Sequence, residues 1–187
     1  MLSHTRRLAA ATVATGIIAG LVGLACIHLL HWIQALAWNM HSGTLLQAVS
    51  AASPTRRVGV LALAGAIGAL SWFFLFRRNQ TITSVGAAVE GTPMPPLRAV
   101  WHALTQIVIV GLGASVGREV APREMAAALA AAAADRLGLC AQDRRIIVAC
   151  GAGAGLAAVY SIPLSGAIYT LEVLLVSRSA RAVASAL

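Results

Sequence analysis

Residues 151–172 read GAGAGLAAVYSIPLSGAIYTLE, and this stretch decides the fold. It fills most of an apolar run, 146–171, that is long enough to cross a bilayer but carries Pro163 near its middle. Because the residue before a proline is disfavoured in a helix, one helix should end and a second should begin at Pro163. Broken helices at membrane depth bring helix N-termini close to an ion. We therefore predict a broken helix pair over 144–162 and 163–176.

The composition of the chain agrees with a membrane location. Of the 187 residues, 59% are hydrophobic and 11% are charged, and the mean hydropathy is +0.81. A soluble domain carries about 25% charged residues, so this composition excludes a soluble enzyme and a disordered chain. The 14 basic residues outnumber six acids, and the net charge is +8. Since the arginines flank apolar runs singly or in pairs, they fit the positive-inside rule rather than nucleic acid binding.

Further apolar runs organise the rest of the chain as an all-α polytopic membrane protein. We predict one transmembrane domain over 1–187, with spans at 8–38, 58–76 and 99–117 and a half-helix at 122–134 that is too short to cross. The first run is too long for the core of a signal peptide and follows an arginine pair at 6–7, which predicts a retained span with a cytoplasmic N-terminus. Arg77 and Arg78 then lie inside and residues 39–54 outside. Glycines and prolines interrupt the pattern after Arg78 and leave room for a short helix at 84–90.

Small residues recur at a spacing that suits close contacts between helices. Glycine pairs four residues apart predict tight packing for every member but Gly117; the pairs are Gly16/Gly20, Gly113/Gly117 and Gly151/Gly155. Cys26 and Cys150 lie inside apolar runs and indicate small packing residues. With Cys140 they show no paired spacing, so we expect no disulfide and no metal site. His28 and His31 are three residues apart, but no acid joins them in the sequence, and polar packing is expected there.

The segment Gly117-Arg118-Glu119 stands between an expected full span and the half-helix. Pro122 predicts that the half-helix begins just before it. Backbone N–H groups at a helix N-terminus carry about half a positive charge and favour an anion. Glu119 could place a tethered carboxylate where the anion binds, and protonation of Glu119 would vacate the site, which makes a gate. The pattern leaves open the alternative that Glu119 caps the helix and pairs with Arg118 or Arg123.

These two segments resemble the motifs of the chloride channel and chloride/proton exchanger (CLC) family. The family carries GREGP or GKEGP, followed by a stretch like GAAAGLAAAFNAPLAGILF with a glutamate shortly after it. Residues 151–166 match that stretch nearly position for position, and Glu172 falls where the glutamate falls. The resemblance covers the N-terminal half of a family member and implies one half of an inverted-repeat fold. It also implies transport of chloride or a similar monovalent anion.

The resemblance transfers roles to individual residues. Glu119 corresponds to the gating glutamate of the family, and Gly117, Arg118, Val120 and Ala121 fill the rest of the anion-binding motif. Val120 replaces a glycine whose N–H approaches the ion in the family, and the proline of the motif comes one place later.

The resemblance also extends to Ser84, Glu172 and Val173. Ser84 is the nearest match to the serine of the family's GSGIP motif, which binds the central chloride, and an ordinary helix cap is the alternative. Val173 stands where exchangers carry a second glutamate that passes protons inward, and family channels also carry an apolar residue there. This implies a channel-like pathway in which Glu172 is a structural acid. A proton-coupled anion exchanger and a truncated, non-conducting fragment or assembly partner are the alternatives.

The motifs and the family resemblance also predict the cofactors and partners of the chain. No nucleotide-binding motif, metal-ligand string or nucleophile with an attendant base occurs in the sequence, so we expect no enzyme and no cofactor. The family implies a homodimer in the lipid bilayer, with one pore in each subunit. A missing C-terminal half should be needed to complete a pore, and the expected location is a bacterial inner (plasma) membrane.

Overall fold

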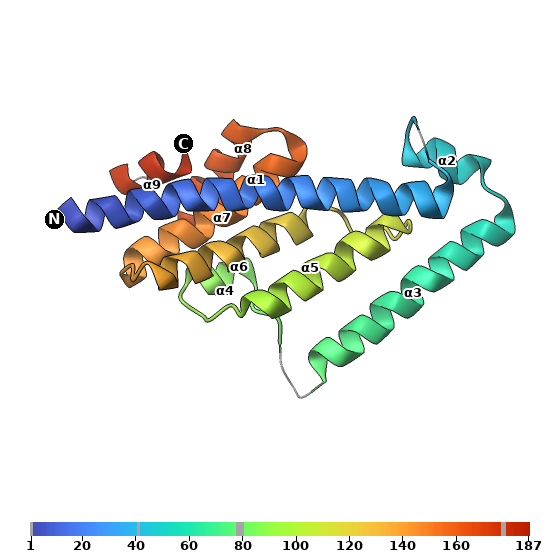
Figure 1. Cartoon of the computed structure of the whole chain (residues 1–187), viewed down its shortest axis with the longest axis horizontal. Helices are drawn as coiled ribbons and strands as arrows, with labels where there is room; N and C mark the ends of the chain where they lie inside the picture. Colours follow the sequence, from blue (N-terminus) through green and yellow to red (C-terminus); the bar gives the residue numbers. More distant parts are fainter. Residues whose placement is uncertain (1, 41, 78–80, 177–178) are drawn as a thin grey trace.

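Helices form every regular element of the computed structural model within the residues that it describes, 2–40, 42–77, 81–176 and 179–187. They are α1 (Leu2–Trp38), α2 (Leu45–Ala51), α3 (Pro54–Phe76), α4 (Val85–Val89), α5 (Pro96–Gly111), α6 (Val120–Arg136), α7 (Ala141–Tyr160), α8 (Pro163–Ile168), the π-helical η1 (Tyr169–Leu175) and α9 (Ala180–Ala186). The predicted all-α class is confirmed. Figure 1 shows α1 along the length of the molecule, with α2 at the end far from the N-terminus. Arg78, predicted to be cytoplasmic, lies outside the described residues.

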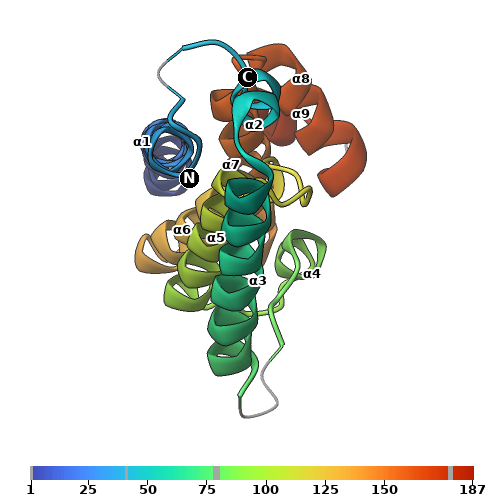
Figure 2. The ribbon, with the colours of Figure 1, turned by 90° about the vertical axis from the view of Figure 1, so that its right-hand side faces the viewer.

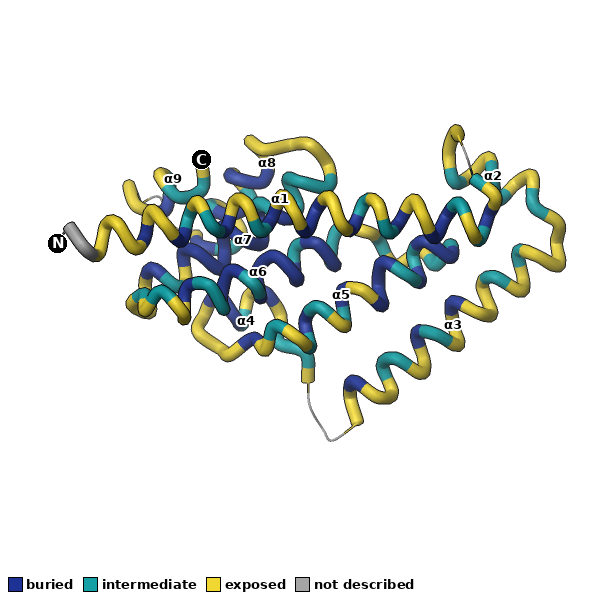
Figure 3. Tube along the Cα trace, viewed as in Figure 1, coloured by how far each residue is buried: buried dark blue, intermediate teal, exposed yellow. Residues whose placement is uncertain are grey.

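Two helices, α1 and α3, are long and apolar enough to cross a membrane, over His4–Trp38 and Pro54–Phe76. At 1.5 Å per residue, α1 is about 55 Å long, which exceeds the hydrocarbon core of a bilayer. Large apolar side chains on one face of α1 point away from the protein: Val13, Ile17 and Leu21 are 60–63% exposed. Figure 3 shows the same exposure along most of α3. Apolar surface of this extent suits contact with lipid.

Helix α5 ends earlier than the apolar pattern predicts. The sequence predicts a span over 99–117, whereas α5 has 16 residues and stops at Gly111, fewer than the ~20 residues of a crossing helix. Gly113 and Gly117 have φ angles of +97° and +84°. Glycine adopts this left-handed conformation without steric cost and commonly ends helices in it. Gly113 still makes a close contact, since an added Cβ would lie 3.0 Å from Trp38 Cζ2. Residues 112–119 form a non-helical connection to α6.

Helices α6 and α7 pack closely because alanine on one faces glycine on the other. A Cβ atom added at Gly151 would lie 2.9 Å from the carbonyl oxygen of Ala126. A Cβ added at Gly155 would lie 2.5 Å from the carbonyl oxygen of Pro122. The buried alanines of α6 include Ala126, Ala127, Ala128, Ala130, Ala131 and Ala134. Gly151 and Gly155 thus have the packing role that their spacing predicts.

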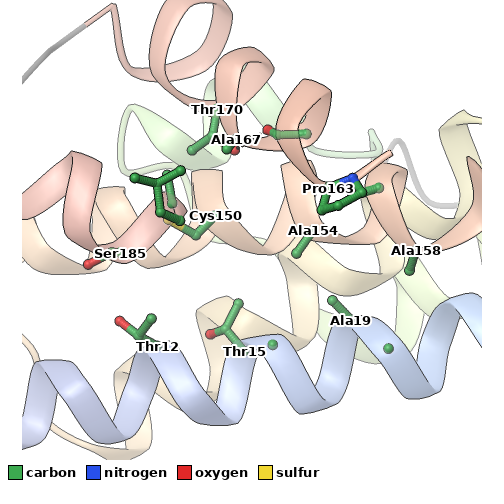
Figure 4. A pocket seen from close by; sticks show the side chains of 16 residues that line it. Thr12, Thr15, Ala19, Cys150, Ala154, Ala158, Pro163, Ala167, Thr170 and Ser185 are labelled. Atoms are coloured by element: carbon green, nitrogen blue, oxygen red, sulfur yellow. Dashed lines mark hydrogen bonds between the residues drawn. The ribbon is translucent and has the colours of Figure 1, made fainter. Parts of the chain in front are cut away.

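The first glycine pair does not have that role. Nothing lies within 4 Å of the Cβ positions of Gly16 and Gly20. These residues line a cavity of about 430 Å³ between α1, α7, α8 and α9. Figure 4 shows Thr15 on α1 facing this cavity. The close approach of α1 to α7 occurs at Gly23 instead, where an added Cβ would lie 2.5 Å from the Cβ of Ala158.

The chain breaks between α7 and α8 where the proline predicts it. Helix α7 ends at Tyr160, Ser161 adopts a left-handed conformation with φ of 55°, and Pro163 takes the first position of α8. This position suits proline because its missing N–H has no helical partner there. Helix α8 then folds back beside α7, as Figures 1 and 2 show. The two backbones meet at glycines, since a Cβ added at Gly166 would lie 2.6 Å from the carbonyl oxygen of Gly153.

Candidate anion site at the start of helix α6

The candidate site forms where the connection 112–119 enters α6. The helix begins at Val120, with Glu119 as its N-cap residue in a helical backbone conformation. The first N–H groups of a helix have no acceptor within it. Here they include those of Val120 and Ala121, whereas Pro122 has no N–H to offer. These backbone donors and the positive end of the helix dipole therefore lie together at the start of the helix, an arrangement that favours an anion.

The Glu119 side chain turns back toward Gly117 rather than capping α6. It makes no capping hydrogen bond, and a Cβ atom added at Gly117 would overlap its carboxylate. The Tyr160 hydroxyl donates a hydrogen bond to Glu119 Oε2 at 3.5 Å, which is long for a bond between a hydroxyl and an oxygen. The Glu119 side chain is half-buried. A carboxyl group is thus held loosely beside the helix start.

Neither neighbouring arginine pairs with Glu119. The ion pairs of the described residues include none between Glu119 and Arg118 or Arg123. The Arg118 guanidinium carbon lies 5.0 Å from the centre of the Tyr160 ring, within the range of a cation–π contact. Arg123 Nη1 donates to the Tyr169 hydroxyl at 3.1 Å. Both cations are therefore directed toward tyrosines.

Sequence reasoning missed these two tyrosines. Both lie within residues 151–172, Tyr160 at the end of α7 and Tyr169 at the start of η1. A phenol in an otherwise apolar run was the available signal, because a tyrosine hydroxyl in such a place usually finds a polar partner.

The other predicted anion-binding residues divide into two groups. Ala121 is fully buried and Val120 is half-buried, so both could contribute to the site through backbone N–H groups. Ser84 instead caps α4, where its Oγ accepts a hydrogen bond from the N–H of Ala87 at 3.2 Å. In the described part of the chain, no hydrogen bond or ion pair in which Ser84 takes part reaches residues 117–121.

Glu172 lies in the first turn of η1, and its side chain is exposed. Val173 beside it is 61% exposed. Protein atoms of this chain therefore do not enclose either side chain.

A buried acid that sequence reasoning gave no role follows the site on α6. Glu124 is 4% exposed, and its Oε2 lies 2.8 Å from His102 Nδ1 on α5. Gln106 Nε2 lies 3.0 Å from the same nitrogen. The presence of an acid in so apolar a segment was the signal, since such acids need polar partners. This cluster ties α6 to α5 just beyond the candidate site.

Comparisons with known proteins identify the family of the chain. Residues 64–187 match the family model described as voltage gated chloride channel. The chain is 33% identical, over 174 residues, to the voltage-gated ClC-type chloride channel ClcB of Escherichia coli O139:H28 (strain E24377A / ETEC) and of Shigella boydii serotype 18 (strain CDC 3083-94 / BS512). Each match covers 90% of this chain and 41% of the relative, so the chain spans about two-fifths of the length of the curated relatives it matches.

A solved structure shares the fold. It is described as the X-ray crystal structure of a slow cyanobacterial Cl⁻/H⁺ antiporter, with a TM-score of 0.74 and 21% sequence identity. The match covers 96% of this chain and 44% of that one. The family model and the curated relatives together show that this chain belongs to the voltage-gated chloride channel (CLC) family of membrane proteins.

Proposed function

We propose that this chain supplies one half of a pathway for chloride or a similar monovalent anion, and that the Glu119 carboxylate gates it. One observation carries the proposal: the carboxylate lies beside the open start of α6 without capping it and without an arginine partner. A permanent cap would have satisfied the N–H groups. The uncapped start leaves those donors for either the carboxylate or an anion.

The mechanism is electrostatic competition. An ionised carboxylate and a chloride ion both gain from the N–H groups of Val120 and Ala121, and both cannot occupy the same place. Protonation of Glu119 removes its charge and lets the anion enter. Binding by dipoles and N–H groups, without a full positive charge, also lets the anion leave quickly. The contact of Arg118 with the Tyr160 ring supports this mechanism, because the contact directs the guanidinium charge away from the start of α6.

The remaining pore groups belong, on this proposal, to a second half that resembles the part of the relatives beyond the match. The chain covers 41% of those relatives, so we infer that it needs this half to conduct. We further propose a homodimer in a bacterial inner membrane, with one pore in each subunit. Val173 favours a channel over a proton-coupled exchanger, because it cannot carry a proton at the position that the exchangers use.

The test is chloride efflux from liposomes at a series of external pH values. The chain is reconstituted with the corresponding C-terminal half of a full-length relative, and alone it should give little selective flux. A single titrating group changes occupancy by up to about tenfold per pH unit. Glu119→Gln should remove this dependence and hold the flux at its low-pH level, because the neutral amide mimics the protonated acid at every pH.

The matched control is Glu90→Gln, at the exposed end of α4, which should keep the wild-type pH curve. A wild-type curve in Glu119→Gln would reject the gate. Proton movement in fixed ratio to chloride would favour the exchanger alternative.

A further inference from the structure

Three distant chain segments meet at the end of the molecule that holds the N-terminus. His4 lies near the start of α1, Cys140 is the N-cap residue of α7, and Asp143 lies in the first turn of α7. Arg181 on α9 reaches the same place, with Nη1 3.4 Å from Asp143 Oδ1. Figure 1 shows the start of α1 and α9 at this end. The cluster is separate from Glu119, which lies at the opposite end of α6.

We propose that His4, Cys140 and Asp143 bind a divalent transition metal of the zinc class. The imidazole nitrogen, thiolate sulfur and carboxylate oxygen are ligands that zinc accepts together. With zinc–ligand bonds of 2.0–2.3 Å, two ligands of a tetrahedral ion lie about 3.3–3.8 Å apart. His4 Nε2 is 3.0 Å from Asp143 Oδ2 and 3.8 Å from Cys140 Sγ. All three ligand atoms lie within 4.8 Å of one another, so small side-chain adjustments bring them to one ion.

The buried carboxylate of Asp143 gives a second, independent reason. Its side chain is 0% exposed, and its Oδ2 has no hydrogen-bond partner although His4 Nε2 lies nearby. Buried carboxylate oxygens in folded proteins are nearly always bonded. Arg181 holds Oδ1 and leaves Oδ2 on the side of His4 and Cys140. Among the described residues, Oδ2 has only the ion-pair contact with His4 Nε2 at 3.0 Å, and a metal ion would supply the bond that it lacks.

The thiol of Cys140 distinguishes a metal site from a simple ion pair. A protonated His4 could pair with Asp143 and join α1 to α7 without any cysteine. Cys140, however, lies at the N-cap position and makes no capping hydrogen bond, and its side chain is exposed. The thiol is therefore available, and solvent can supply a fourth ligand. The other two cysteines, Cys26 and Cys150, are buried.

The first experiment is a cobalt(II) titration of the full chain, purified in detergent with a tag that contains no histidine. A thiolate ligand gives cobalt a sulfur-to-metal charge-transfer band in the near ultraviolet. We expect one cobalt per chain and this band in the wild type, no band in Cys140→Ser, and an unchanged band in the control Cys26→Ser. His4→Ala should weaken binding at least about 100-fold, since loss of an outer-shell partner alone costs 10–100-fold. An unchanged band in Cys140→Ser, or no band in the wild type, would overturn the proposal.

The second experiment measures protection of the thiol and does not depend on Asp143 variants, which could fail to fold. Maleimide should label Cys140 readily, zinc should slow the labelling, and a chelator should restore it. In His4→Ala, zinc should lose this protection while labelling without zinc stays fast. Equal zinc protection in the wild type and in His4→Ala would show adventitious binding to the thiol and would refute the three-ligand site.

Discussion

At the scale of single residues, Tyr160 organises the candidate gate. Its hydroxyl reaches the Glu119 carboxylate, and the face of its ring receives the Arg118 guanidinium. One side chain therefore steadies the negative group and holds the positive group aside. The Tyr169 hydroxyl instead accepts a hydrogen bond from Arg123, and its ring also lies near that guanidinium, so Tyr169 serves as a control for Tyr160.

Tyr160→Phe should ease the opening of the gate. Loss of the donated hydrogen bond makes the ionised carboxylate less stable beside α6, so protons or anions displace it more readily. For a bond as long as 3.5 Å, we expect the midpoint of the flux–pH curve to move up by about half a pH unit. Tyr169→Phe should leave the midpoint unchanged. An unchanged midpoint in Tyr160→Phe would show that Tyr160 takes no part in gating.

At the scale of elements, the residue pattern predicted which segments form helices better than it predicted where those helices end. The break at Pro163 was predictable because proline restricts the backbone before it and lacks an N–H. The end of α5 was not, because an apolar run continues past Gly113 while the backbone turns there. The pairing of His102 with Glu124 joins residues on two helices, and no spacing in the sequence specifies which helices pack together. At the site, the motif predicted a role for Glu119, but the position of its side chain depends on tertiary structure.

The glycine contacts between α6 and α7 should be sensitive to a single methyl group. Gly155→Ala places a Cβ against the backbone of Pro122, where neither helix can yield without moving, and should cost about 1–3 kcal/mol. Gly16→Ala is the matched control, since its Cβ meets nothing within 4 Å. It should be neutral or stabilising by up to about 1 kcal/mol. Unfolding of the purified variants in detergent measures both. Equal stabilities would contradict the packing described for Gly155.

At the scale of the whole molecule, the polar ends define an orientation in the membrane. The start of α1, the loop between α6 and α7, and α9 converge around Asp143. Helix α2 lies at the opposite end of α1. If the arginines that precede the first apolar run stay in the cytoplasm, the first end faces inward and α2 faces outward.

Cysteine labelling in vesicles tests this orientation. Leu46 on α2 is 75% exposed, and the native Cys140 is exposed near the other end. A membrane-impermeant maleimide should label Leu46→Cys only from the external side and Cys140 only from the cytoplasmic side, because a bilayer lies between them. Cys26 and Cys150 are buried, so the maleimide should not label them from either side. Labelling of Leu46→Cys solely from the cytoplasmic side would reverse the topology.

The glycine–alanine contact gives α7 a mechanical property as well as a packing one. Its 20 residues form a rod about 30 Å long, with Asp143 in the first turn and Tyr160 as the last residue. Where α7 touches α6, neither glycine nor alanine has a rotamer to change. Side-chain rearrangement at this contact therefore cannot absorb a displacement of α7. If the gate and the metal site proposed above both hold, a displacement of α7 at Asp143 would reach Tyr160, because the two residues lie at opposite ends of one helix.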